Sequence, residues 1–260
     1  MKKFFFFIGL VIIGCLFSFL YYYERWKPLW SLESPKELYT VVPRHDDTLR
    51  VVMIGDSWVG MRTDVKNLEF QKILSEMIGK PVKLMTKGKG GEKSRGIYNL
   101  LFEDCTRKLM TEAPNYCVIF AGINDAASNR GTKQYVYHYR LILQFLIGNN
   151  IQPVVIEIPD INIWNVKKEK PIKDIVGDFI KSKMTHCSMY QIDDYREALY
   201  SMLAEENLLN QVVYVPIRDW NGNSGIKLNL FLEDQIHLND LGYAKMDTCI
   251  AGYIARHYGN

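Results

Sequence analysis

The chain has 260 residues, of which 48% are hydrophobic and 23% charged, and its formal net charge at pH 7 is +3. This composition is ordinary for a globular protein, and so small a charge gives no reason to expect nucleic acid as a partner. The five cysteines show no Cys-x-x-Cys spacing, so we expect no structural zinc site. We expect no cofactor either.

The N-terminus carries two lysines followed by an uncharged run, Phe4–Tyr23. A run of this length spans a bilayer core as a helix, and the basic end favours the cytoplasmic side. We therefore predict a signal anchor at residues 1–23, with the rest of the chain in the periplasm or at the cell surface. The alternatives are a cleaved signal peptide and a lipoprotein lipidated at Cys15, which follows Ile12-Ile13-Gly14.

Residues 24–49 contain three prolines and little periodicity, and we predict a stalk there. Residues 50–260 are predicted to form one domain. Short apolar runs predict five strands, which are Val51–Ile54, Val82–Met85, Tyr116–Phe120, Pro153–Ile158 and Val212–Val215. Helical patterns separate them at Asp64–Met77, from a glycine-rich loop to Met110, at Lys133–Ile147, Asp174–Met184 and Asp194–Asn207, and from Asn239 or Asp240 to His257. This alternation predicts an α/β fold, a parallel sheet with helices on both faces.

The first strand runs into Gly55-Asp56-Ser57, which places a hydroxyl at the carboxyl edge of the sheet, where such folds bind ligands. A serine needs a base within hydrogen-bond reach to act as a nucleophile. His237 is the best candidate, because it alone among the histidines sits at a loop-to-helix junction with a carboxylate, Asp234, three residues earlier. Taken singly, both motifs also fit ordinary helix capping.

Attack on an ester creates an oxyanion, which needs hydrogen-bond donors already in place. The sequence offers the N–H of Ser57, a glycine N–H in the loop Gly88–Gly91, and the amide of Asn124. The glycine loop and the Asn124 segment can equally be simple turns. A phosphate-binding Walker loop does not fit, because Glu92 precedes Lys93 where that motif has glycine.

Four motifs occur in a fixed order: Gly55-Asp56-Ser57, the glycine loop, Gly122-x-Asn124-Asp125 and Asp234-x-x-His237. In this order they resemble the four sequence blocks of the SGNH (GDSL-like) hydrolase family, over about residues 50–257. The resemblance implies a flavodoxin-like three-layer α/β/α sandwich with a five-stranded parallel sheet, and serine esterase or acyl-transfer chemistry without a metal.

The resemblance also implies roles for single residues. Ser57 corresponds to the nucleophile, His237 to the base and Asp234 to the residue that orients it. Ser57, Gly91 and Asn124 correspond to the oxyanion donors. The asparagine that usually begins the glycine block is missing here, so the alignment of that block leaves Gly90 as an alternative to Gly91. Trp58 replaces the leucine of the family motif, which points to an altered acyl-binding pocket.

Together these features predict a membrane-anchored extracytoplasmic serine esterase that hydrolyses small acyl esters, acetyl above all, on a glycan. The alternatives are an O-acyltransferase of cell-envelope polysaccharide, a lysophospholipase or thioesterase acting on a lipid ester, and an inactive binding module. A basic cluster beside the glycine loop would suit an anionic polymer or lipid headgroup, or it is only a solvated surface. Its members are Lys87, Lys89, Lys93 and Arg95.

Overall fold

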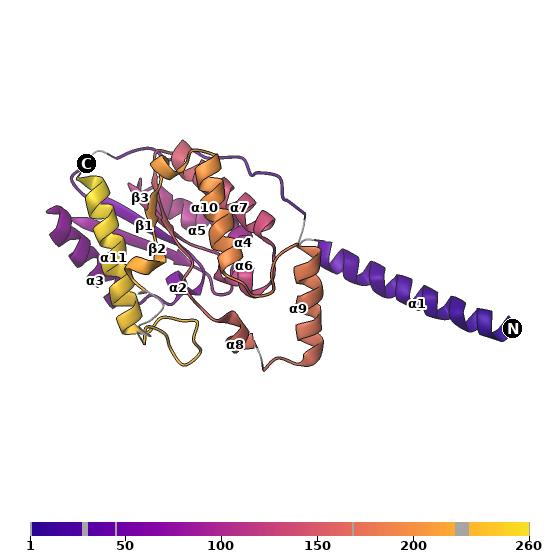
Figure 1. The fold of residues 1–260 in the computed structure, drawn as a ribbon. Coiled ribbons are helices and arrows are strands. Elements are labelled where there is room, and N and C mark those ends of the chain that lie inside the picture. The colour runs from indigo at the N-terminus through magenta and orange to yellow at the C-terminus, as the bar shows by residue number, and fades with distance from the viewer. Residues whose placement is uncertain (1, 28–30, 45, 168, 222–228, 260) are drawn as a thin grey trace.

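The computed structural model describes residues 2–27, 31–44, 46–167, 169–221 and 229–259. A five-stranded parallel sheet in the order β2-β1-β3-β4-β5 forms its centre (Figure 1). The strands are β1 Leu49–Gly55, β2 Val82–Gly88, β3 Tyr116–Phe120, β4 Gln152–Ile156 and β5 Val213–Val215. From β1 the chain moves first to one side and then, with β3, to the other, so the topological switch lies between β1 and β3.

The central strands consist mainly of apolar and β-branched residues because both of their faces are covered. Every position of β1 and of β3 is buried. Continuous apolar runs are typical of parallel strands between two helix layers. Cys117 in β3 is fully buried, as expected for a core residue, and none of the five cysteines forms a disulfide.

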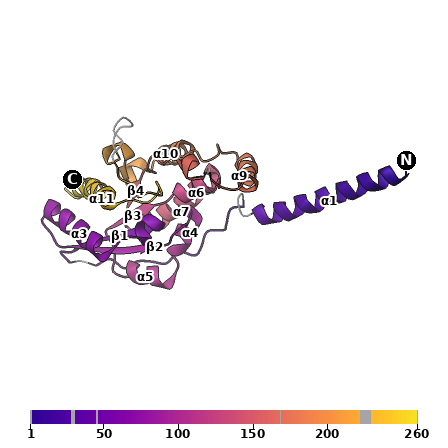
Figure 2. The same ribbon diagram turned by 90° about the horizontal axis from the view of Figure 1, so that it is seen from below.

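Helices cover both faces of the sheet, which confirms the expected three-layer fold. Helices α3 and α11 pack side by side on one face, and α4, α7 and α10 pack together on the other (Figures 1 and 2). The α-helices are α1 Lys2–Trp26, α2 Ser57–Gly60, α3 Asp64–Ile78, α4 Ser94–Leu100, α5 Asp104–Met110, α6 Ile123–Ala127, α7 Thr132–Gly148, α8 Ile163–Lys167, α9 Ile172–Met184, α10 Asp193–Glu205 and α11 Asp240–Tyr258. Short 3₁₀ turns occur at Leu209–Gln211 and Ile217–Asp219.

Two elements differ from the sequence-based expectation. The strand expected to end at Met85 continues to Gly88, because β2 stays paired with β1 up to the partners Gly55 and Gly88. The single helix expected to reach Met110 is two helices, α4 and α5. Three successive i→i−3 hydrogen bonds, from residues 101–103 to residues 98–100, tighten the chain and end α4.

The segment expected to be a stalk lies along the domain instead of standing free of it. The N–H of Lys36 donates to the Tyr98 hydroxyl at 2.8 Å, and the Tyr39 hydroxyl donates to the carbonyl of Leu101 at 2.7 Å. Val41 is buried, and its N–H donates to the side chain of Asn149 at 2.7 Å. Alternate apolar side chains in an extended stretch can thus bind a surface without forming any regular element.

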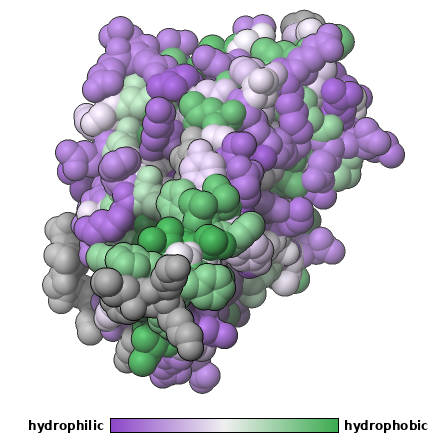
Figure 3. Space-filling view, turned by 90° about the vertical axis from the view of Figure 1, so that its right-hand side faces the viewer, coloured by the Kyte–Doolittle hydropathy of each residue, from purple (hydrophilic) through white to green (hydrophobic). Residues whose placement is uncertain are grey.

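Helix α1 projects away from the domain (Figures 1 and 2). Its segment Phe5–Trp26 has a mean hydropathy of 2.3, and the most apolar stretch of this segment is not buried against the domain. By length and composition the segment can therefore cross a membrane. A signal sequence would meet the same test. Figure 3 views the molecule from the side on which α1 projects, and hydrophobic side chains gather there within a hydrophilic surround.

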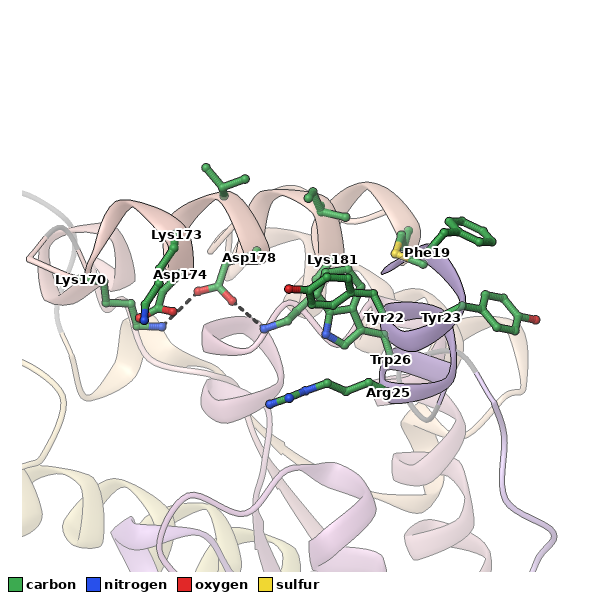
Figure 4. A pocket seen from close by; sticks show the side chains of 14 residues that line it. Phe19, Tyr22, Tyr23, Arg25, Trp26, Lys170, Lys173, Asp174, Asp178 and Lys181 are labelled. Carbon is green, nitrogen blue, oxygen red and sulfur yellow. Dashed lines mark hydrogen bonds and ion pairs between the residues drawn. The ribbon is translucent and has the colours of Figure 1, made fainter. Parts of the chain in front are cut away.

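The C-terminal end of α1 lies beside α9, and a cavity of about 750 Å³ separates them (Figure 4). Tyr22 and Trp26 line it from α1. On α9, the buried Asp178 pairs with Lys170 at 3.1 Å and with Lys181 at 3.0 Å. The outer side of α9 is apolar and exposed, with Ile172 at 80% and Phe179 at 51%.

Candidate active site

Ser57 is the first residue of α2, directly after the central strand β1. The carboxylate of Asp56 caps this helix by accepting from the N–H of Trp58 at 3.0 Å. The strand can turn so sharply because Gly55 has no side chain, and a Cβ there would lie 2.6 Å from that of Phe120. The N–H of Ser57 has no acceptor within its own helix, so it can donate to a ligand.

The structure brings His237 and Asp234 to Ser57, although 180 residues separate His237 from Ser57 in sequence. His237 Nε2 lies 2.9 Å from Ser57 Oγ, and His237 Nδ1 lies 2.5 Å from Asp234 Oδ2. The other carboxylate oxygen of Asp234 accepts from the N–H groups of Ile236 and His237, both at 2.9 Å. One oxygen of Asp234 therefore orients the His237 ring, and the other stabilises the backbone of the loop.

Asp234 stays a carboxylate over a wide pH range. Its burial raises the pKa, but hydrogen bonds from the His237 ring and from the N–H groups of His237 and Ile236 together hold the pKa below the ordinary value. An ionised acceptor fixes the proton on Nδ1 and leaves Nε2 as the acceptor that faces the serine hydroxyl.

The loop that carries His237 is held by Trp58. The Trp58 indole N–H donates to the carbonyl of Ile236 at 3.1 Å, and the ring packs against Trp220 and Phe231. Only 2% of Trp58 is exposed. This residue, expected at an acyl-binding pocket, lies inside the domain, where it contacts the segment beside the histidine and lines a small cavity of about 10 Å³.

Asn124 lies next to Ser57 because β3 is the neighbour of β1. It belongs to α6, which starts directly after Gly122, where the φ of 124° and the close contact with Ile158 require glycine. One N–H of the Asn124 amide donates to Asp56 Oδ2 at 3.1 Å. An amide has two N–H groups, so the second remains for a ligand.

Asp56 belongs to the site, although the sequence predicted no role for it beyond its place in the first motif. It is buried and holds both Trp58 and Asn124. Burial raises its pKa to about 7, against the hydrogen bond from Trp58. Its position between Gly55 and Ser57 in the first motif is the feature of the sequence that could have indicated this role.

The glycine loop lies against Ser57, but the nearer glycine is Gly90. A Cβ on Gly90 would lie 4.0 Å from Ser57 Cβ, whereas one on Gly91 would have no neighbour within 4 Å. Gly91 has a φ of 73°, which turns the chain into α4. At the start of the loop Gly88 touches α2 so closely that a Cβ would lie 2.1 Å from the N atom of Gly60.

A second buried carboxylate, Asp125, joins the glycine loop to α6, and no role was predicted for it from the sequence. Asp125 accepts from the N–H of Ser94 at 2.8 Å and from its hydroxyl at 2.7 Å. Burial raises the pKa of Asp125 to about 6, against the hydrogen bonds from Ser94. Because Asp125 follows Asn124 and Ser94 follows the loop, this contact sets the spacing of the two segments.

The grouped side chains can perform acyl-transfer chemistry. A hydroxyl, a ring nitrogen and a carboxylate lie in hydrogen-bonded succession, and the Asn124 amide is bonded to Asp56, the residue before the serine. In the described part of the chain, no three His, Cys, Asp or Glu side chains are grouped as metal ligands.

Solved structures of low sequence identity share this fold. The lipase/acylhydrolase from Enterococcus faecalis has a TM-score of 0.59 at 16% identity, covering 80% of this chain and 96% of that one. The psychrotrophic esterase EstA from Pseudoalteromonas sp. has 0.57 at 14%, covering 83% and 100%. The acetyl xylan esterase AlAXEase has 0.54 at 17%, covering 80% and 99%.

A search of curated proteins found no significant match. The family model described as the GDSL-like lipase/acylhydrolase family matches residues 53–245, which contain all four motifs. That match covers well over half of the chain, and the protein therefore belongs to the GDSL-like lipase/acylhydrolase family, the SGNH hydrolases.

Proposed function

We propose that Ser57 is the nucleophile of this ester-hydrolysing serine enzyme, His237 its base and Asp234 the residue that orients the base. The observation that carries this proposal is the continuous hydrogen-bonded series from Ser57 Oγ at 2.9 Å through the His237 ring to Asp234 at 2.5 Å.

The reaction follows from the geometry. Ser57 Oγ attacks the ester carbonyl while its proton moves to His237 Nε2, and the tetrahedral oxyanion accepts hydrogen bonds from the Ser57 N–H, the Asn124 amide and a glycine N–H of the loop. The same proton then passes to the leaving alcohol, which leaves an acyl-serine. A water molecule, deprotonated by His237, hydrolyses that intermediate and restores the serine. Gly91 and Gly90 remain the two candidates for the glycine donor.

We further propose that the acyl group is small, with acetyl as the preferred case. The structural similarity to an acetyl xylan esterase supports a short acyl group. A glycan as the acetylated substrate is in keeping with the similar fold of an acetyl xylan esterase.

The proposed site of action is the outer face of a membrane. Helix α1 exposes its apolar side chains over its length, and the exposed apolar side of α9 lies next to the point where α1 enters the domain. Together with the two lysines at the start of α1, this supports a retained anchor and an extracytoplasmic domain. Protease added to cells with the outer barrier opened is expected to degrade the domain, and a protected domain would contradict this topology. The mass of the membrane-bound chain separates the anchor from a cleaved form and from a lipoprotein formed at Cys15.

The first test is hydrolysis of p-nitrophenyl acetate, butyrate and octanoate by the full chain in detergent, beside Ser57→Ala. We expect turnover of acetate well above that of octanoate, no turnover in the variant, and labelling of the wild type alone by a fluorophosphonate. A preference for octanoate would favour a lipid or thioester substrate. A folded wild type that neither turns over nor labels would favour a binding module, and turnover that requires an added sugar acceptor would favour an acyltransferase.

A further inference from the structure

Another cavity, of about 300 Å³, adjoins the proposed oxyanion site. It lies between the glycine loop, α4, α6 and α7, and its lining includes Lys93, two residues after Gly91, and Asp125, directly after Asn124. Two of the segments that supply oxyanion donors therefore continue into its wall. Its volume is at the lower end of the range for small-ligand sites, which suits one sugar unit rather than a longer chain.

Most of the basic side chains around this cavity are already paired. Lys89 pairs with Glu92 at 2.7 Å, and Arg95 pairs with Glu33. Lys87, outside the cavity, lies 3.7 Å from Glu103. Of the basic cluster noted in the sequence, these three members are thus neutralised within the protein.

Lys93 is different. Among the described residues it has no acidic partner within 4.0 Å, and its Nζ contacts only the carbonyl of Gly91, at 3.4 Å. Burial lowers the pKa of Lys93 and of Arg130, which also lines the cavity. The carboxylates that act on these two cations are Asp125, whose oxygens are already bonded to Ser94, and Glu92, which pairs with Lys89. The cavity therefore has an excess of positive charge in partly desolvated surroundings, which favours an anionic ligand.

We propose that this cavity binds a carboxylate-bearing sugar, a hexuronic acid unit, next to the acylated unit of the substrate. Its carboxylate lies between Lys93 and Arg130, both of which line the cavity. The inference rests on the proposed esterase function for its role, which is to select an anionic glycan. The binding itself does not require the ester to be cleaved.

The test is calorimetric titration of the full chain in detergent with digalacturonic acid, and with galactobiose as the neutral counterpart. We expect the uronate to bind at least about tenfold more tightly than the neutral disaccharide. Lys93→Gln and Arg130→Gln should each weaken uronate binding about tenfold or more, because each removes a charge-assisted hydrogen bond. Lys72→Gln, a change of an exposed lysine on α3, is the matched control and should bind as the wild type does.

Equal binding of the two disaccharides, or no binding of either, would overturn the proposal, as would tighter binding of galactose 6-phosphate than of the uronate. Thermal unfolding of each variant shows whether it is folded. If Arg130→Gln does not fold, Lys93→Gln provides the test, because Lys93 is only half-buried. Hydrolysis of p-nitrophenyl acetate by the same samples separates the two proposals. Turnover without uronate binding refutes the sugar site alone, whereas uronate binding without turnover or labelling refutes the esterase alone.

Discussion

Asp234→Asn isolates one function of the proposed catalytic carboxylate. The asparagine can keep the two backbone hydrogen bonds at 2.9 Å through its oxygen, so the loop retains its shape. In place of Oδ2 it then presents an NH₂ group to His237 Nδ1, where the carboxylate now accepts at 2.5 Å. The ring must respond by placing its proton on Nε2, so it donates to Ser57 instead of accepting the serine proton.

The size of the effect follows from the exposure of the carboxylate. In buried triads the same exchange lowers kcat by about 10⁴. The side chain of Asp234 is 45% exposed, so solvent screens part of its effect on the imidazolium. We therefore expect a loss of about 10² to 10³ in kcat, equivalent to about 3–4 kcal/mol of transition-state stabilisation.

Initial rates with p-nitrophenyl acetate at neutral pH measure this loss, and thermal unfolding by circular dichroism checks the fold. KM and the melting temperature should stay near the wild-type values in Asp234→Asn. Asp234→Ala should also melt earlier, because it removes the acceptor of two backbone N–H groups, each worth about 1 kcal/mol. A kcat within a few-fold of the wild type in Asp234→Asn would refute the role assigned to this residue.

Three further changes test the surroundings of Ser57. Asn124→Ala is expected to lower kcat for p-nitrophenyl acetate by about 10² to 10³ with a native circular dichroism spectrum, because one oxyanion donor is lost; an unchanged kcat would remove Asn124 from the site. In the wild type, the folded protein keeps the Asp56 proton up to pH about 7, whereas the unfolded chain releases it near pH 4, so the free energy of unfolding falls between these pH values. Asp56→Asn has no such proton, so its free energy of unfolding in urea should rise relative to that of the wild type from pH about 4 to about 7, and the difference should then stay constant. A difference that does not change with pH would contradict the raised pKa. Arg62→Met should cost about 3–5 kcal/mol in the same assay, because it leaves Asp247 buried without its partner at 2.7 Å, whereas a loss below about 1 kcal/mol would show that the site relaxes or hydrates.

Local patterns were sufficient for the order of strands and helices. The run from Val51 to Ile54 and the stretch Tyr116–Phe120 are apolar because both faces of the sheet are covered, and that demand is visible in the sequence itself. The four motifs fall where strands end or helices begin, and in parallel α/β folds those points share one edge. The pairing of Ser57, His237 and Asp234 could therefore be predicted, and the structure brings the three together.

Features that depend on which surfaces meet could not be predicted in this way. Nothing in the sequence around residues 31–44 indicates the contacts of Tyr39 and Val41 with the domain, since an extended segment has no periodicity to detect. Trp58 was expected near the acyl group, yet it is buried beneath the His237 loop, because its neighbours Trp220 and Phe231 come from distant parts of the chain.

By itself, therefore, the sequence determined the α/β class, the family motifs and the residues able to carry acyl-transfer chemistry, because these depend on local periodicity and residue type. The tertiary structure alone decided how the motifs are held, through Asp56 with Asn124 and Asp125 with Ser94. It also decided that Lys93, alone in its basic cluster, lacks an acidic partner among the described residues. Both outcomes depend on burial and on contacts between residues far apart in the chain, which no local pattern encodes.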